Sequence, residues 1–390
     1  MYRVRKLEIS SQKDVCDTIA LESGKLYSTT VKFFWRTVNR KGLWLKPKSL
    51  MRLFTSNKMQ AHSADASVQQ FFHALNSWRE ARKTVPTANP PRKLKKYTAV
   101  TWKKSAIFIR NSQLILSNGK ITEPLIIEWN HPETPVLVTL HWDGSGYELV
   151  FCYEYEDTEK QQITTEKPIG LDIGQINMIA CSNGTILNGR LLRSLKQGRE
   201  RSQAILQKRM SYKKEGSESW KKLRDAKQSL CKKVTNQARD ILHKYTTGLV
   251  MYLQKEGYNT LVVGDLTGYR VENDKGPVRN QENHAWMYAQ ISWYLKYKWE
   301  NLGLKYVPQE ESYTSRTCPC CGNQIEVKGR NYICPVCGFR GHRDLVGATN
   351  ILRKYLGSFG KPSKPVDGLM ARPSHVRYKP NMSVAYGLVL

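Results

Sequence analysis

The chain has 390 residues, a formal net charge of +29 and a hydrophobic content of 40%. This composition excludes a disordered or low-complexity chain and leaves room for two or three domains with hydrophobic cores. The excess of 62 Lys and Arg over 33 Asp and Glu favours a polyanionic partner, of which nucleic acid is the usual one. The alternatives are a generally basic solvated surface and an attraction to anionic membranes.

Apolar runs and cysteines indicate the compartment. No apolar run approaches the roughly 20 residues that a membrane-spanning helix needs, and the first ten residues lack the apolar core of a signal peptide. Four of the nine cysteines form two Cys-x-x-Cys pairs, and the others are scattered. We therefore expect a protein of the prokaryotic cytosol, without a membrane partner, that holds one zinc site rather than disulfides.

The N-terminal part mixes strand and helix signals. Residues 1–10 alternate weakly as a first strand. Two basic helices follow at about 14–39 and 63–83, with a predicted loop containing Lys46-Pro47-Lys48 between them. From 105 to 155 the pattern is that of strands, including a hairpin around Asp143-Gly144-Ser145-Gly146. We predict a β-barrel domain over 1–166, with a helical recognition insert around 12–90.

Two basic segments are candidate nucleic-acid contacts. One cluster lies beside Tyr97 and Trp102, where cations and aromatic rings suit phosphate contact and base stacking; an exposed linker is the alternative. The other is the helical region from 191 to about 256, which we expect to be broken at 216–219 into a helical hairpin. Its part 196–239 carries 14 Lys and Arg against 4 Asp and Glu. The candidate residues are Arg92, Lys93, Lys95, Lys96, Lys208, Arg209, Lys221 and Lys222.

The character of the chain changes at Lys167. The run PIGLDIGQINMIACSNGTILNGR predicts three antiparallel strands with Asp172 at the first turn, which is how an RNase H-like fold opens. The buried strand 259–266 ends at Gly264-Asp265, a short strand follows at 304–308, and a helix over 344–356 closes the fold. We predict an α/β multidomain chain whose second domain, 167–356, is RNase H-like, followed by a flexible tail over 357–390.

The stretch 313–351 carries a zinc-ribbon signature. Cys318 and Cys321 form one pair and Cys334 and Cys337 the other, each followed by Gly, with twelve residues between the pairs. Four thiolates complete a tetrahedron, so a zinc ion held here is structural and leaves no open position for chemistry. Cys320 lies inside the first pair, with the wrong spacing for chelation. We place the ribbon at 313–340, inserted in the second domain.

Acidic residues at strand and helix ends indicate the chemistry. In an RNase H-like fold, carboxylates on the first strand, the fourth strand and a late helix converge on two Mg²⁺ ions about 3.5–4 Å apart, for phosphodiester cleavage. Magnesium prefers hard oxygen ligands. Asp172 and Asp344 fit two of the three places, although an Asp at a Gly turn is by itself more often a turn former.

These motifs resemble a known family. The runs IGLDIG, VVGDL and YTSRTCPCCG…YICPVCGFRGHRDLVGATNI, in this order, are similar to the TnpB family of transposon-encoded RNA-guided nucleases and to the small type V CRISPR effectors. The resemblance covers about 167–356 and is weaker over 1–166. It implies a RuvC-type nuclease that binds guide RNA, recognises a short motif beside a double-stranded DNA target and cuts with Mg²⁺. It gives Asp172 the first catalytic place and Asp344 the third.

The second catalytic place departs from the family pattern. The family strand ends in Glu-Asp-Leu, whereas this chain has Gly264-Asp265-Leu266, so Gly stands where the catalytic Glu is expected. On a regular strand Asp265 faces the other way, but a bulge at Gly264 can turn it inward. We expect Asp265 to be the substitute, with Glu272, Asp274 and His342 as alternatives.

Several functions are therefore open. We predict an RNA-guided, Mg²⁺-dependent DNA endonuclease, in which Asp172 and Asp344 are metal ligands. The alternatives are an RNA-guided DNA-binding protein that does not cut, because of Gly264, and a zinc-ribbon DNA-binding protein without a guide. A conventional transposase is least favoured, since the resemblance is to accessory proteins of transposons.

Overall fold

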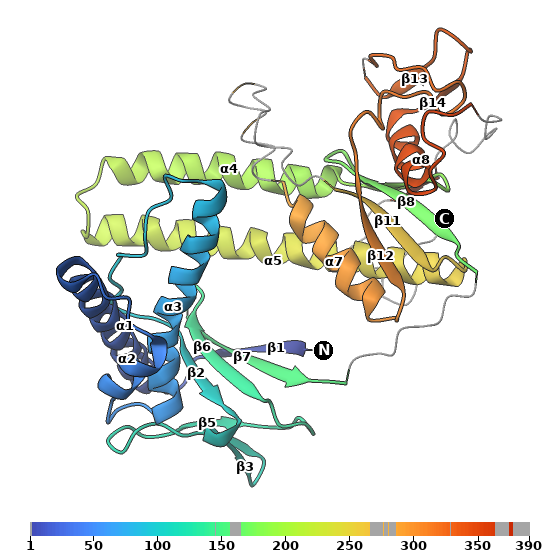
Figure 1. Cartoon of the computed structure of the whole chain (residues 1–390). Helices are drawn as coiled ribbons and strands as arrows, with labels where there is room; N and C mark the ends of the chain where they lie inside the picture. Colours follow the sequence, from blue (N-terminus) through green and yellow to red (C-terminus); the bar gives the residue numbers. More distant parts are fainter. Residues whose placement is uncertain are drawn as a thin grey trace. The chain divides into compact units, whose positions relative to one another are not determined.

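The structure is a computed structural model that describes residues 2–144, 146–156, 165–265, 276, 280, 286–327, 329–362 and 374–376. The chain divides into two compact units, Met1–Glu156 and Asp157–Leu390. Each unit has its own hydrophobic core, and Figure 1 shows the elements of both. Among the described residues, no helix is both long and apolar enough to cross a membrane.

The strands of the first unit form two antiparallel sheets. One has the order β1-β7-β6-β2 and the other β3-β4-β5. Buried side chains of both sheets, including Trp102, Leu114 and Phe151, share one core. Among the described residues the two sheets remain separate, so a closed barrel stays a prediction. The strands are β1 (Tyr2–Ile9), β2 (Val100–Lys103), β3 (Ile107–Arg110), β4 (Gln113–Leu116), β5 (Leu125–Glu128), β6 (Leu137–Trp142) and β7 (Tyr147–Glu154).

Three helices are inserted between β1 and β2. The predicted pair is present as α1 (Lys13–Lys41) and α3 (Ala61–Thr84), which pack through aromatic side chains such as Phe34 and Phe71 in edge-to-face contact. A short third helix, α2 (Pro47–Leu53), forms in a segment predicted to be a loop. Its first residue is a proline, whose fixed φ suits the first turn and whose missing N–H is not needed there.

The second unit is built on a six-stranded sheet of order β12-β11-β8-β9-β10-β15. The three strands that come first in the sequence, β8, β9 and β10, pair antiparallel in that order, as predicted. On the other side of β8, β11 and β12 add in parallel. The last strand, β15, comes from the C-terminal segment and pairs in parallel with β10. The strands are β8 (Pro168–Ile173), β9 (Asn177–Cys181), β10 (Thr185–Asn188), β11 (Thr260–Asp265), β12 (Lys305–Glu310) and β15 (Ser374–Val376).

Helices cover both faces of this sheet. The long hairpin of α4 (Arg190–Ser211) and α5 (Glu218–Lys255) breaks close to the predicted place, where Ser217 caps α5 by accepting a hydrogen bond from the Trp220 N–H. Buried leucines of α5 and of α7 (Tyr288–Glu300) pack on one face. On the other face lie α8 (Arg343–Tyr355) and residues 313–342, here called the cysteine segment. This segment contains a hairpin of β13 (Asn331–Ile333) and β14 (Arg340–His342) (Figure 1).

Candidate metal centres and nucleic-acid-binding surfaces

The four predicted cysteines meet at one point. Their Sγ atoms all lie within 4.8 Å of one another. The separation is 3.6 Å between Cys318 and Cys337, and also between Cys321 and Cys334. Four thiols at this spacing from two Cys-x-x-Cys turns match the donor set that zinc prefers in structural sites. The cluster can therefore hold a metal ion such as zinc, as the sequence predicts.

Both cysteine turns have the same backbone geometry. The N–H of Gly322 donates to the carbonyl of Cys318 at 2.9 Å, and that of Gly338 donates to the carbonyl of Cys334 at 3.0 Å. Both glycines have positive φ, near 79° and 74°, which turns the chain tightly enough to aim amides at the sulfurs. At Cys321 a hydrogen bond from the Asn323 backbone lowers the pKa of the thiol to about 6. The first loop thus favours the thiolate form of Cys321, whereas burial raises the pKa of the Cys318 and Cys334 thiols.

The cysteine segment is fastened to α8 by buried hydrogen bonds. The side chain of Asn350 is fully buried and its Nδ2 donates to the carbonyls of Thr314 and Thr317, each at 2.7 Å. The guanidinium of Arg353 donates to the carbonyls of Pro319 and Ser358. These contacts couple the position of α8 to the folding of the cysteine segment.

The first predicted catalytic carboxylate lies between β8 and α8. Asp172 is half-buried, and its Oδ2 occupies the space that a side chain at position 347 of α8 would need, 2.7 Å from an ideal Cβ built on Gly347. Burial, followed by the nearby carboxylates of Glu311 and Asp344, raises the pKa of Asp172 well above its usual range, and two arginines oppose this only partly. Asp172 is thus in a site where negative charge accumulates.

Asp344, the acid predicted for the third catalytic place, lies in the first turn of α8 next to this site. Its Oδ2 accepts a hydrogen bond from Asn177 Nδ2 of β9 at 2.8 Å and another from Arg330 of the cysteine segment. His342 caps the helix by accepting a hydrogen bond from the Asp344 N–H at 3.3 Å. The carboxylate is therefore held by two hydrogen bonds, and the backbone of the same residue by a third. The structure brings Asp172 and Asp344 to one face of the sheet from positions 172 residues apart in the sequence.

The strand register places Gly264 and Asp265. Leu171 of β8 lies opposite Val263 of β11, so Gly264 follows beside Asp172. Side chains of neighbouring strands in register point to the same face and alternate along each strand. A side chain at 264 would therefore point to the Asp172 face, whereas Asp265 is exposed and belongs to the opposite face. Its predicted catalytic role stays a prediction.

The alternatives to Asp265 have different outcomes. Glu272 and Asp274 lie outside the described residues. His342 is next to Asp344, where its contacts are those of a helix cap. Glu311 was not among the sequence-based candidates, yet it contributes to the raised pKa of Asp172. Burial, followed by the charges of Asp265 and Glu310, raises the pKa of Glu311 itself to about 7.

Sequence reasoning missed three residues that contact or surround the carboxylates. Asn177 and Arg330 are single polar residues without a motif, and their contacts depend on how β9 and the cysteine segment fold back onto α8. Glu311 had a usable signal. It is an acid one residue beyond β12, the strand parallel to β11, and ends of parallel strands meet at one edge of a sheet.

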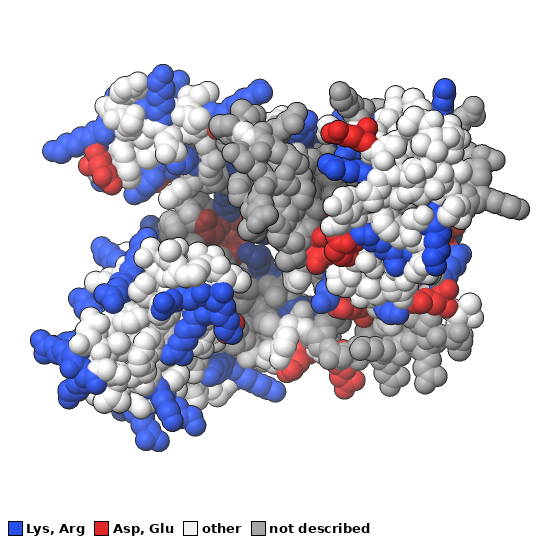
Figure 2. Space-filling model, turned by 45° about the horizontal axis from the view of Figure 1, so that its top comes forward, with Lys and Arg blue, Asp and Glu red and all other residues white. Residues whose placement is uncertain are grey.

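The predicted basic residues are all exposed and fall into two groups. Arg92, Lys93, Lys95 and Lys96 lie in the segment after α3, where Arg92 stacks over the Trp35 ring and Lys95 over the Tyr27 ring, with centroid distances of 4.9 and 4.4 Å. The other four, Lys208, Arg209, Lys221 and Lys222, lie on α4 and α5 near the turn between them. Figure 2 shows Lys and Arg over much of the visible face, with fewer Asp and Glu.

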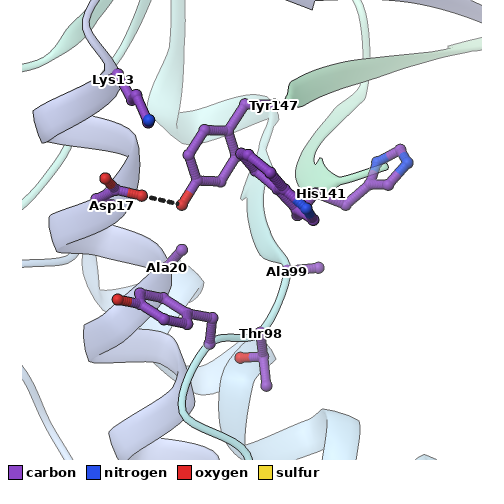
Figure 3. Close-up of a pocket in the computed structure, with 9 residues that line it drawn as sticks. Lys13, Asp17, Ala20, Thr98, Ala99, His141 and Tyr147 are labelled. Atoms are coloured by element: carbon purple, nitrogen blue, oxygen red, sulfur yellow. Dashed lines mark hydrogen bonds between the residues drawn. The ribbon is translucent and has the colours of Figure 1, made fainter. Parts of the chain in front are cut away.

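The first unit also contains a pocket of about 580 Å³. It is bordered by α1, by residues 97–99 and by the hairpin of β6 and β7 (Figure 3). Tyr147 donates a hydrogen bond to Asp17 at 2.6 Å, and burial together with this bond raises the pKa of Tyr147 beyond its usual range. None of the predicted catalytic or metal-binding residues lines this pocket.

The chain is similar to proteins of known description. A family model described as "Cas12f1-like, TNB domain" matches residues 288–351, and one described as "Probable transposase" matches 150–270. A Streptomyces pristinaespiralis protein named "Putative RNA-guided DNA endonuclease" is 29% identical over 269 residues, which are 66% of this chain and 63% of that protein. A TnpB-like protein of Methanocaldococcus jannaschii is 28% identical over 164 residues, 40% of this chain and 58% of that one. The matches therefore span less than two thirds of each relative.

A solved structure shares the fold. It is the cryo-EM structure of a Cas12f1–sgRNA–target DNA complex, with a TM-score of 0.58 and 13% identity, covering 88% of this chain and 83% of that one. This similarity confirms the predicted α/β class. At this level of identity it concerns the fold alone.

Proposed function

We propose that the chain is a member of the TnpB family of RNA-guided DNA endonucleases, related to the Cas12f effectors, and that it binds a guide RNA and cuts double-stranded DNA beside a short recognition motif. The α/β fold and the cysteine cluster are described above. The activity, the RNA and DNA partners, the RuvC-type assignment of the second unit and the use of Mg²⁺ are parts of this proposal.

The observation that carries the proposal is the meeting of Asp172 and Asp344 on one face of the sheet. Asp172 comes from the first strand of the unit and Asp344 from its last long helix, which are two of the three places where an RNase H-like nuclease keeps its metal ligands. Gly347 leaves the space that the Asp172 carboxylate occupies. The pKa of Asp172 is raised by burial and by the neighbouring carboxylates, and a cation that neutralises this negative charge would stabilise the site.

The side chains present suit magnesium. Carboxylate oxygens are its preferred protein ligands, and Asn177 orients Asp344 as an outer partner of a metal ligand does. When bound, the ions supply activation of water and stabilisation of the leaving oxygen in phosphodiester cleavage. The residues of this chain position the ligands: β8 fixes Asp172, while the helix cap and Asn177 fix Asp344.

The basic residues are the proposed nucleic-acid contacts. All eight are exposed, and three of the four in the 92–96 cluster lie over aromatic rings, which combines charge with a rigid apolar platform. Their binding to RNA and DNA should weaken as salt rises, because each phosphate contact releases counterions.

The zinc-loaded chain, purified with RNA transcribed beside its own gene, tests the proposal. We expect cleavage of a motif-flanked DNA duplex that matches the guide, no cleavage in EDTA, and no cleavage by D172A or D344A. Failure of the wild-type complex to cut in Mg²⁺ would contradict the nuclease activity, and absence of a discrete co-purified RNA would favour a guide-free DNA-binding protein.

A second candidate is an RNA-guided DNA-binding protein that does not cut. The observation in its favour is Gly264, which removes the family's second carboxylate from β11. It predicts sequence-specific, guide-dependent DNA binding that is the same for the wild type and D172A, with both leaving the DNA intact.

A further inference from the structure

The space beside Gly264 is filled by another residue's carboxylate. An ideal Cβ built on Gly264 would lie 1.7 Å from Oε1 of Glu311, 2.5 Å from its Cδ and 2.7 Å from its Cγ. No real Cβ approaches a neighbour so closely, so the Glu311 side chain occupies the volume that any side chain at position 264 would need. Gly264 is therefore the residue that admits Glu311.

Glu311 also lies on the required face of the sheet. In the register of β11 with β12, Gly264 is opposite Gln309, and Glu311 is two residues further along the chain. Because side chains alternate, Gln309 and Glu311 point to the same face as position 264 and Asp172. Glu310, between them, has an exposed side chain that forms an ion pair with Lys354 of α8 at 2.6 Å.

The Glu311 carboxylate is incompletely satisfied. Its Oε1 is buried and accepts no hydrogen bond from any described residue. A buried acceptor without a donor is destabilising, so such an atom calls for a specific reason. The Glu311 carboxylate lies against Gly264 and raises the pKa of Asp172, so it is close to the site of Asp172 and Asp344.

We propose that Glu311 supplies the second metal-binding carboxylate of the site, reaching from the end of β12 into the space vacated at Gly264. The inference rests on the proposed nuclease function, which it deepens. In this assignment the second acid comes from the end of β12 instead of from position 264 on β11, and it lies on the same face of the sheet. Asp172, Glu311 and Asp344 then form the ligand set.

Mn²⁺ binding to the zinc-loaded full chain without RNA tests the assignment directly. Electron paramagnetic resonance can follow Mn²⁺, and the absence of RNA removes competing phosphates. We expect E311Q, which keeps the shape and removes the charge, to bind Mn²⁺ at least about tenfold more weakly. The matched control is E310Q, the adjacent glutamate, whose exposed carboxylate is already paired with Lys354 and for which we expect binding within about twofold of wild type. Melting temperatures of both variants exclude unfolding.

A carboxylate swap separates ligation from a structural role. E311A should lose Mn²⁺ binding and guided cleavage. The double variant G264E/E311A returns a carboxylate to the same volume from β11, so its Mn²⁺ affinity or its cleavage rate should be at least about tenfold higher than that of E311A. A residue that only supports the fold is not replaced by an acid on the neighbouring strand.

The inference is overturned if E311Q binds Mn²⁺ like wild type, if D265N weakens binding and E311Q does not, or if the swap restores nothing while both variants remain folded. The outcomes also separate it from the nuclease proposal. A wild type that cuts, with E311Q cutting equally, contradicts the role of Glu311 alone. Glu311-dependent Mn²⁺ binding in a chain that never cuts supports the ligand set and contradicts the nuclease.

Discussion

The cysteine cluster and the carboxylate site lie on the same face of the second unit but are assembled in opposite ways. The four thiols come from one stretch of about 20 residues, and two short turns bring them within 4.8 Å of one another. The carboxylates come from β8, from the residue after β12 and from α8, and no local turn contains two of them. Among the described residues, only the cysteines form a metal-ligating group that compact.

This difference shows what each site needs in order to form. A thiolate cluster made by local turns can assemble once its segment closes around a metal, and metal binding supplies the folding free energy. A carboxylate site assembled from distant elements depends on the sheet and on the docking of α8, and like charges oppose it until a cation binds. The hydrogen bonds of Asn350 link the two sites, because they hold α8 against the cysteine segment.

The largest expected effect is on the cysteine cluster. C334S removes one of four ligands, so we expect zinc to fall from about one ion per chain toward zero, because the remaining three thiolates no longer close the tetrahedron. Mass spectrometry of the metal content measures this. C320S, which changes a cysteine outside the cluster, should keep its zinc. Full zinc occupancy in C334S would show that the cluster is not the zinc site.

D172N should affect activity and stability in opposite directions. We expect guided cleavage to fall by about 10³-fold, equivalent to about 4 kcal/mol of transition-state stabilisation from a metal site. In metal-free buffer the melting temperature should rise, because burial and the neighbouring acids disfavour the charged form of Asp172 and Asn carries no charge. A D172N chain that melts lower than wild type in the absence of metal would contradict the crowding of charge at this site.

N350A tests the link between the two sites. Loss of the amide leaves the carbonyls of Thr314 and Thr317 without their buried donor, so we expect destabilisation by about 2–4 kcal/mol in denaturant titrations. The matched control is T349V in the adjacent position, where the buried hydroxyl has no hydrogen-bond partner among the described residues. T349V should change stability by less than about 1 kcal/mol. Equal effects of the two would mean that Asn350 acts only through packing.

R330Q should have the smallest effect, which is a modest increase in the Mn²⁺ affinity of the carboxylate site. The Arg330 side chain is partly exposed and pairs with Asp344, so removing the charge should strengthen Mn²⁺ binding by no more than about fivefold, the worth of an exposed ion pair. R340Q, on the exposed side of β14, serves as a control for the change in net charge. Weaker Mn²⁺ binding in R330Q would indicate that Arg330 positions Asp344 rather than competing with the cation.

Sequence analysis succeeded where the pattern is local. It found the cysteine turns, the antiparallel strands after Lys167, the helices α1 and α3, and the break between α4 and α5, because each depends on residues a few positions apart. It predicted a loop where α2 forms, although Pro47 at the first helical position was a signal for a helix. Of its four candidates for the second carboxylate, Asp265 ends β11, Glu272 and Asp274 follow it in the sequence outside the described residues, and His342 precedes α8.

The sequence by itself determined the four cysteines of the cluster, the two acids that fit the family pattern and the resemblance to the TnpB family, since these depend on residue type and spacing. The tertiary structure decided which residues share a face and which side chain fills a space. In the sequence, Gly264 indicates only that the second catalytic carboxylate is missing from this position, because a missing side chain does not show which other residue replaces it. In the folded chain the register of β11 with β12 places Glu311 in that volume, since neighbouring strands point their side chains to the same side of a sheet.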